Sequence, residues 1–167
     1  MILSKDPIRK SPRIKNMSTI LFLAEDDPLI SRMYERAFHA SGFDLKMAID
    51  GEVAITILKS MNPKPTIALL DVMMPKKSGY DVLRAMKEDP TLKSIPVILL
   101  TNLAGQQDAE KGLELGAVLY LVKSQYSPKE IVDKVKEISA GYSRTDGVPE
   151  VKVGVKNIED KKDKPKS

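Results

Sequence analysis

The sequence of 167 residues has no cysteine and a single histidine, His39. The absence of cysteine excludes a disulfide scaffold, zinc–thiolate sites and a cysteine nucleophile. One histidine excludes metal sites built from several imidazoles, and its place near the end of a predicted helix favours a surface role. No apolar run approaches the ~18–20 residues that a membrane-spanning helix needs, and residues 1–16 lack the apolar core of a secretory signal. We therefore expect a cytoplasmic protein without a membrane span.

The net charge of +4 is distributed unevenly along the chain. Residues 1–17 carry five Lys or Arg against one Asp, and residues 143–167 carry seven basic residues against five acids. The segment 18–142 holds the remaining 15 basic and 17 acidic residues. We predict a domain over 18–142 between a basic, flexible N-terminal extension (1–17) and a charged, mostly disordered C-terminal tail (143–167). The basic balance therefore belongs to the ends and does not indicate a nucleic-acid-binding face.

Short apolar runs alternate with helical patterns between residues 19 and 141. The runs are continuous, as in strands that are buried on both faces, and they cover residues 19–24, 45–49, 66–71, 95–101 and 118–122. Helical spacing follows each of them, at about residues 29–38, 52–61, 79–88, 106–115 and 128–140. Such alternation predicts an α/β fold with a single doubly wound, five-stranded parallel sheet, (βα)5.

The first predicted helix has a clear start and a continuous apolar face. Asp27 followed by Pro28 suits a helix N-cap and first helical position, so we assign Asp27 mainly a capping role. Apolar residues at Leu29, Met33 and Ala37, next to Ile30, Tyr34 and Phe38, recur at helical spacing. We expect this face to pack on the sheet.

Polar side chains stand where four of the predicted strands end. Glu25 and Asp26 follow the first strand, Asp71 ends the third, Thr101 ends the fourth and Lys123 follows the fifth. Ligands bind outside the carboxyl ends of the strands in open sheets of this type. Clustered carboxylates raise each other's pKa unless a cation neutralises them, and oxygen ligands without His or Cys suit Mg²⁺. An Asp can also act as a nucleophile and carry a phosphoryl group, which Lys123 and Thr101 can bind.

Four motifs in this chain resemble the receiver domain of two-component response regulators, the CheY-like domain. They are residues 21–28 (LFLAEDDP), 69–75 (LLDVMMP) with Ser78-Gly79, 96–101 (PVILLT) and 116–123 (GAVLYLVK). The resemblance covers about three quarters of the chain. It implies a flavodoxin-like strand order 2-1-3-4-5.

The resemblance also implies the roles of the acids. Asp71 would accept a phosphoryl group from a sensor histidine kinase or a phosphotransfer protein. Asp26, Asp71 and the backbone carbonyl of Met73 would hold Mg²⁺, and Glu25 would act through a metal-bound water. The protein would catalyse no reaction beyond its own phosphorylation and dephosphorylation.

Three further residues would convert phosphorylation into a change of surface, by the same resemblance. Lys123 would pair with Asp71 and then with its phosphate. Thr101 would move to bind the phosphoryl group, and Tyr120 would follow from an outward to an inward position. The surface of the fourth helix, fifth strand and fifth helix would then control a protein partner, in a monomer or a phosphorylation-linked dimer. The alternative for Tyr120 is an ordinary half-buried aromatic of a strand.

The sequence departs from the family's pattern after the Thr and after the Lys. Asn102 stands where a small residue is usual, and either crowds the phosphoryl pocket or adds a hydrogen bond. Ser124 stands where a proline with a cis bond is usual, so we expect a trans Lys123–Ser124 bond. Met73 and Leu103 stand at the two positions that flank the attacking water in the family. Because both are apolar, we expect a long-lived phosphorylated form.

Two other readings and the question of output remain open at this point. A pseudo-receiver would bind partners without phosphorylation. A Mg²⁺-dependent phosphatase of the haloacid-dehalogenase type would need an Asp two residues after the nucleophile, where this chain has Met73. Residues 148–167 offer too little periodic apolar sequence for a DNA-binding domain, although Val151, Val153 and Val155 suit one short strand. We therefore expect a stand-alone receiver that acts on a protein partner.

Overall fold

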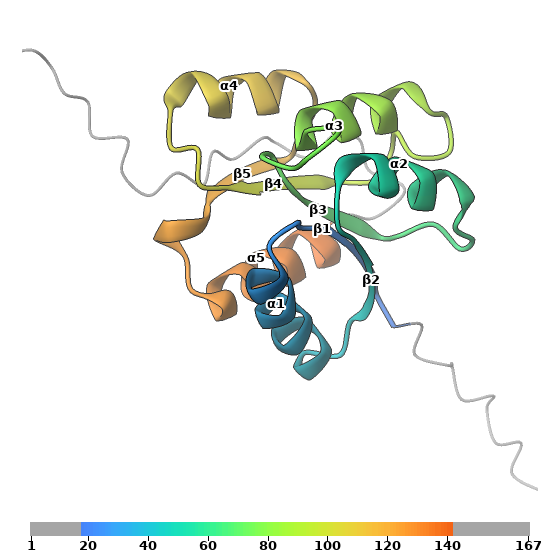
Figure 1. The fold of residues 1–167 in the computed structure, drawn as a ribbon. Helices are drawn as coiled ribbons and strands as arrows, with labels where there is room; N and C mark the ends of the chain where they lie inside the picture. The colour runs from blue at the N-terminus through green and yellow to red at the C-terminus, as the bar shows by residue number, and fades with distance from the viewer. Residues whose placement is uncertain (1–17, 142–167) are drawn as a thin grey trace, which may run out of the picture.

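The computed structural model of the chain describes residues 18–141 (Figure 1). The sheet consists of β1 (Ile20–Ala24), β2 (Asp44–Ala48), β3 (Ile67–Asp71), β4 (Val97–Thr101) and β5 (Leu119–Val122). The helices are α1 (Pro28–Ala40), α2 (Gly51–Ser60), α3 (Gly79–Glu88), α4 (Gln106–Glu114) and α5 (Pro128–Gly141), with a 3₁₀ turn at Lys123–Gln125. The predicted extension, the predicted tail and the short strand suggested by Val151, Val153 and Val155 lie outside the described residues.

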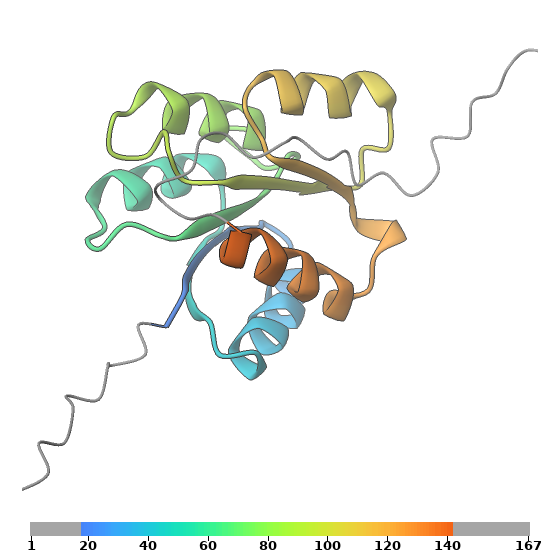
Figure 2. The same cartoon turned by 180° about the vertical axis from the view of Figure 1, so that it is seen from behind.

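The five strands form one parallel sheet in the order β2-β1-β3-β4-β5. Helices α1 and α5 cover one face, and α2, α3 and α4 cover the other, as Figures 1 and 2 show from opposite sides. The predicted fold class and strand order are therefore confirmed. The boundaries shift by a residue or two; for example, β4 begins at Val97 rather than at residue 95.

The predicted apolar face of α1 is only partly correct. Tyr34 and Phe38 are buried, with 2% and 0% of their surface exposed, but Leu29 is 80% exposed and Met33 is 40% exposed. These two pairs occupy adjacent rows on the helix surface, because residues four apart lie above one another. The cluster formed by the sheet, α1 and α5 contains Tyr34 and Phe38, with Ile30 and Ala37 packed against it, but it does not include Leu29 or Met33. Apolar spacing therefore identified the amphipathic side of the helix but not the row that the core covers.

Candidate functional site at the carboxyl edge of the sheet

The buried polar residues of the described chain gather at one edge of the sheet. They are Glu25, Asp50, Asp71 and Thr101, and each is at most 5% exposed. Each one ends or closely follows a different strand, from β1 to β4. Because all strands are parallel, these positions lie at the common carboxyl edge. The edge therefore concentrates buried polar groups that the body of the sheet excludes.

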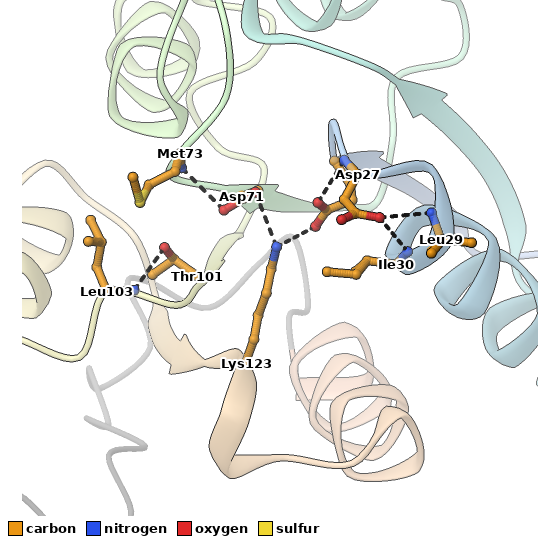
Figure 3. Close-up of polar contacts among 9 residues, drawn as sticks. Asp27, Leu29, Ile30, Asp71, Met73, Thr101, Leu103 and Lys123 are labelled. Atoms are coloured by element: carbon orange, nitrogen blue, oxygen red, sulfur yellow. Dashed lines mark hydrogen bonds and ion pairs between the residues drawn. The ribbon is translucent and has the colours of Figure 1, made fainter.

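The Lys123 side chain crosses to two of these carboxylates (Figure 3). Its Nζ lies 2.6 Å from Glu25 Oε2 and 3.1 Å from Asp71 Oδ2. All three side chains are less than 10% exposed. The ammonium thus neutralises part of the negative charge between β1 and β3.

Asp27 plays the capping role predicted for it. Its carboxylate accepts hydrogen bonds from the backbone N–H groups of Leu29 and Ile30, at 2.8 and 3.1 Å. Its own backbone N–H donates to Glu25 Oε1 at 3.2 Å. The start of α1 therefore holds the Glu25 carboxylate in place, and the N-cap prediction is confirmed.

The protonation of the site reflects its burial. Burial raises the pKa of Asp71 and of Glu25 above their ordinary values, although the Lys123 ammonium partly opposes this. Burial by itself disfavours the charged form of Lys123. The hydrogen bond that Lys123 donates to Glu25 and the negative charges of Asp71 and Glu25 outweigh that effect and raise the pKa of Lys123. The site thus has an excess of negative charge that one ammonium does not fully neutralise.

The acids of the site suit a divalent cation. One carboxylate oxygen from each of Glu25, Asp26 and Asp71 lies within 4.8 Å of the other two. Asp26 is more open to solvent than its neighbours, so the group faces outward on one side. Met73, which follows β3, donates its backbone N–H to Asp71 Oδ1 at 3.2 Å. An all-oxygen set with excess negative charge fits a hard cation such as Mg²⁺.

Thr101 and Tyr120 bind the same short segment after β4. The Leu103 N–H donates to Thr101 Oγ1 at 3.2 Å, and the Tyr120 hydroxyl donates to the Leu103 carbonyl at 2.8 Å. Tyr120 is fully buried, so this structure has the tyrosine inside, rather than half-buried. Gly112 of α4 leaves room for it, since a Cβ there would lie 3.1 Å from the Tyr120 ring.

The two departures from the family's pattern have simple local outcomes. The Lys123–Ser124 bond is trans, as predicted. Within residues 18–141, the peptide bond in the cis form is Asn62–Pro63. Lys123 and Ser124 belong to the 3₁₀ turn that leads from β5 toward α5. The Asn102 side chain is exposed. His39 is exposed in the last turn of α1, which agrees with the surface role predicted for it.

Sequence reasoning missed two features of this edge. It paired Lys123 with Asp71 only, whereas the shorter contact joins Lys123 to Glu25. It also left Asp50 out of the candidate residues, although this carboxylate is buried just after the end of β2. The position of Asp50, an acid two residues beyond a strand at the edge that carries the site, was the available clue.

A family model for the response regulator receiver domain matches residues 21–136. This chain belongs to the receiver domain family. The response regulator Rcp1 of Synechocystis is 32% identical over 141 residues, which cover 80% of this chain and 95% of that protein. The structure of the Mn²⁺-bound form of Rcp1 covers 79% of this chain and 99% of its own, with a TM-score of 0.61.

Other relatives are longer than this chain. The probable transcriptional regulator ycf27 of Porphyridium aerugineum is 36% identical over 118 residues, which cover 71% of this chain and 47% of that protein. The chain thus spans about half the length of this relative. Receiver domains are signalling modules that interact with histidine kinases and bind a divalent metal at an acidic pocket. None of the described helices is long and apolar enough to cross a membrane.

Proposed function

We propose that the protein is a phosphorylation-dependent switch of two-component signalling, with Asp71 as the phospho-acceptor. The observation that carries this proposal is the surroundings of Asp71. Its carboxylate contacts Lys123 at 3.1 Å and lies within 4.8 Å of carboxylate oxygens of Glu25 and Asp26. A nucleophilic carboxylate beside an ammonium and a cation site has what phosphoryl transfer needs, namely positioning and charge neutralisation.

In the proposed reaction, an Asp71 oxygen attacks the phosphorus of a phosphohistidine on a sensor kinase or phosphotransfer protein. The new O–P bond forms as the P–N bond breaks, and the leaving imidazole takes up a proton from the solvent. Asp26, Asp71 and the Met73 carbonyl would hold Mg²⁺, with Glu25 acting through a bound water. The cation would neutralise charge on the transferred phosphoryl oxygens.

Lys123 and Thr101 would receive the phosphoryl group from the protein side. The Lys123 ammonium already lies beside Asp71 and would pair with a phosphoryl oxygen. Thr101 would exchange its contact with the Leu103 N–H for a hydrogen bond to the phosphoryl group. Because Tyr120 is bonded to the Leu103 carbonyl, movement of this segment would reach Tyr120 and the surface of α4, β5 and α5.

This surface would control a downstream protein partner in the cytoplasm, in a monomer or a phosphorylation-linked dimer. The phosphorylated form would be long-lived, because Met73 and Leu103 offer no polar side chain to orient a water. The measurement is the loss of aspartyl phosphate in Mg²⁺ without a phosphatase. A lifetime of minutes supports the proposal on lifetime, and turnover within seconds contradicts it.

The test of the main proposal compares the wild type with Asp71→Ala in Mg²⁺ and acetyl phosphate, by intact mass and acid-labile phosphate. We expect one phosphoryl group on the wild type and none on Asp71→Ala. Asp44→Asn, an aspartate at the opposite edge of the sheet, is the matched control and should label like the wild type. If the wild type is not phosphorylated and does not bind beryllofluoride either, the result would favour a pseudo-receiver. Continuous release of phosphate over many turnovers would favour a phosphatase.

A further inference from the structure

The segment that joins β3 to α3, residues 72–78, is closed at its base. The Gly79 N–H donates to the Val72 carbonyl at 2.9 Å. A Cβ on Gly79 would overlap the Asp71 carbonyl oxygen and lie 2.9 Å from the Val72 Cα. The two ends of the segment are therefore in direct backbone contact, and the segment forms a closed loop beside Asp71.

The tip of this loop has an unusual backbone. Lys76 has a φ of 67°, in the left-handed region that non-glycine residues seldom adopt. The next N–H, that of Lys77, donates to the Pro75 carbonyl at 2.8 Å. Such a conformation costs free energy and persists where the surrounding structure holds it.

The tip of this loop contacts the start of α2. A Cβ on Gly51, the first residue of α2, would overlap the Lys77 carbonyl oxygen and lie 2.6 Å from the Lys77 Cβ. Asp50, the N-cap of α2, accepts a hydrogen bond from the Val53 N–H at 2.8 Å. The second Asp50 oxygen lies 3.5 Å from Lys76 Nζ. The Asp50 side chain is 7% exposed, so one buried carboxylate joins the helix start to the loop tip.

We propose that Asp50 and Gly51 are positioning residues for the metal site. They hold the tip of the loop, while the Val72–Gly79 contact holds its base, and Met73 lies between these two anchors. The inference rests on the proposed function, in which the Met73 carbonyl is a metal ligand. A main-chain ligand has no side-chain rotamer to adjust, so its position depends on the path of the loop. The corner between β2 and α2 thereby tunes the cation affinity of a site formed by β1 and β3.

The test measures Mn²⁺ affinity of the full chain by electron paramagnetic resonance. Gly51→Ala should weaken Mn²⁺ binding about ten-fold or more, the effect typical of residues that orient metal ligands. Gly141→Ala is the matched control, because a Cβ there meets nothing within 4 Å. Gly42→Ala is a second control. Gly42 has a φ of +85°, so an alanine there would strain the backbone, but the residue follows α1 at the opposite edge of the sheet. It should lower stability and leave Mn²⁺ affinity unchanged.

A second variant covers the case in which Gly51→Ala does not fold. Asp50→Asn keeps a good helix cap but removes the charge that pairs with Lys76. It should weaken Mn²⁺ binding about two- to five-fold, because the Lys76 ammonium is largely exposed. Without metal, both variants should speed hydrogen exchange of the Gly79 amide, a change that the two glycine controls should not cause.

The outcomes separate this inference from the proposed function. If the wild type binds Mn²⁺ and Asp71→Asn does not, the metal site stands. The positioning role alone would then be overturned if Asp50→Asn, and Gly51→Ala where it folds, bind Mn²⁺ as tightly as the wild type. In that case the exchange rate of the Gly79 amide should also match that of the wild type. If the wild type itself does not bind Mn²⁺, the metal site of the proposed function is wrong, and the positioning of that site fails with it. Hydrogen exchange of the Gly79 amide would then test only whether Asp50 and Gly51 hold the loop.

Discussion

The body of the sheet and its carboxyl edge differ in what they bury. In the body, the central strands β1, β3 and β4 bury apolar side chains almost completely, as with Phe22, Leu69 and Leu99 at 0% exposure. At the edge, β1 and β3 lead into the buried carboxylates of Glu25 and Asp71, β4 ends in the buried hydroxyl of Thr101, and the nearly buried Lys123 ammonium reaches in from β5. Burial of apolar surface stabilises the fold by about 25 cal/mol per Å², whereas burial of charge costs free energy unless it is paired.

Stability and chemistry are therefore separated along each of these strands. Burial raises the pKa of Glu25 and of Asp71, so the charged form of both carboxylates is disfavoured at this edge. The adjoining apolar body supplies the stability that lets such an edge persist. If the body supplies the stability, a change in the body should alter the free energy of unfolding more than a change at the edge.

Removing one large side chain from the body should give the largest loss of stability. Leu69→Ala leaves a cavity in the cluster between the sheet, α1 and α5, and we expect a loss of about 3–4 kcal/mol. Urea unfolding followed by circular dichroism measures it. Mn²⁺ affinity of the folded variant should remain that of the wild type. A loss below about 1 kcal/mol would contradict the assignment of stability to the body.

Removing the ammonium should destabilise the edge itself. Lys123→Met leaves Glu25 and Asp71 buried without their shared cation, and we expect a loss of about 2–3 kcal/mol at neutral pH without metal. Adding Glu25→Gln to this variant should recover part of the loss, because one uncompensated charge disappears. Unchanged stability of Lys123→Met in urea would show that the pair is well solvated.

Removing a carboxylate should have the opposite sign. Asp71→Asn removes the cost of burying a charged carboxylate while Lys123 keeps its partner Glu25, so we expect a gain of about 1 kcal/mol in the metal-free protein. Urea unfolding in a chelator measures this gain. Saturating Mg²⁺ should narrow or reverse the difference in unfolding free energy between Asp71→Asn and the wild type, because only the wild type is stabilised by binding the cation. A clear loss of stability without metal would mean that the Asp71–Lys123 pair outweighs the cost of burial.

The smallest effect is a dependence of stability on pH. Since the pKa of Glu25 and of Asp71 is raised on folding, the folded state holds these protons more tightly than the unfolded state. Their contribution to stability is therefore present below the ordinary values near 4 and is lost as pH rises through the raised values. The raised pKa of Lys123 contributes stability that is lost only above about pH 10.5.

The measurement is the metal-free unfolding free energy of the wild type minus that of Glu25→Gln/Asp71→Asn, from pH 4 to pH 7. Groups common to both proteins, such as Asp50 and Asp81 with their lowered pKa values, cancel in the difference. We expect the unfolding free energy of the wild type to fall relative to that of the variant as the pH rises over this range. A difference that stays constant or grows in favour of the wild type would contradict the raised pKa values.

Much of the fold was predictable because its signals are local. The apolar runs predicted all five strands, and the pair Asp27–Pro28 predicted the start of α1. The prediction for Leu29 and Met33 failed because spacing reports the side of a helix and not the extent of the surface that covers it. The strand order required the resemblance to receiver domains, since alternation alone allows more than one order.

The candidate site divides in the same way. The residue types at the strand ends could be predicted from the sequence, and a parallel sheet brings these strand ends to one edge. Two contacts could not be predicted and appear only in the folded chain: Lys123 makes its shorter contact with Glu25, 98 residues away, and Gly51 lies against Lys77. Those contacts depend on the distances between packed elements, and no periodicity along the chain encodes such distances.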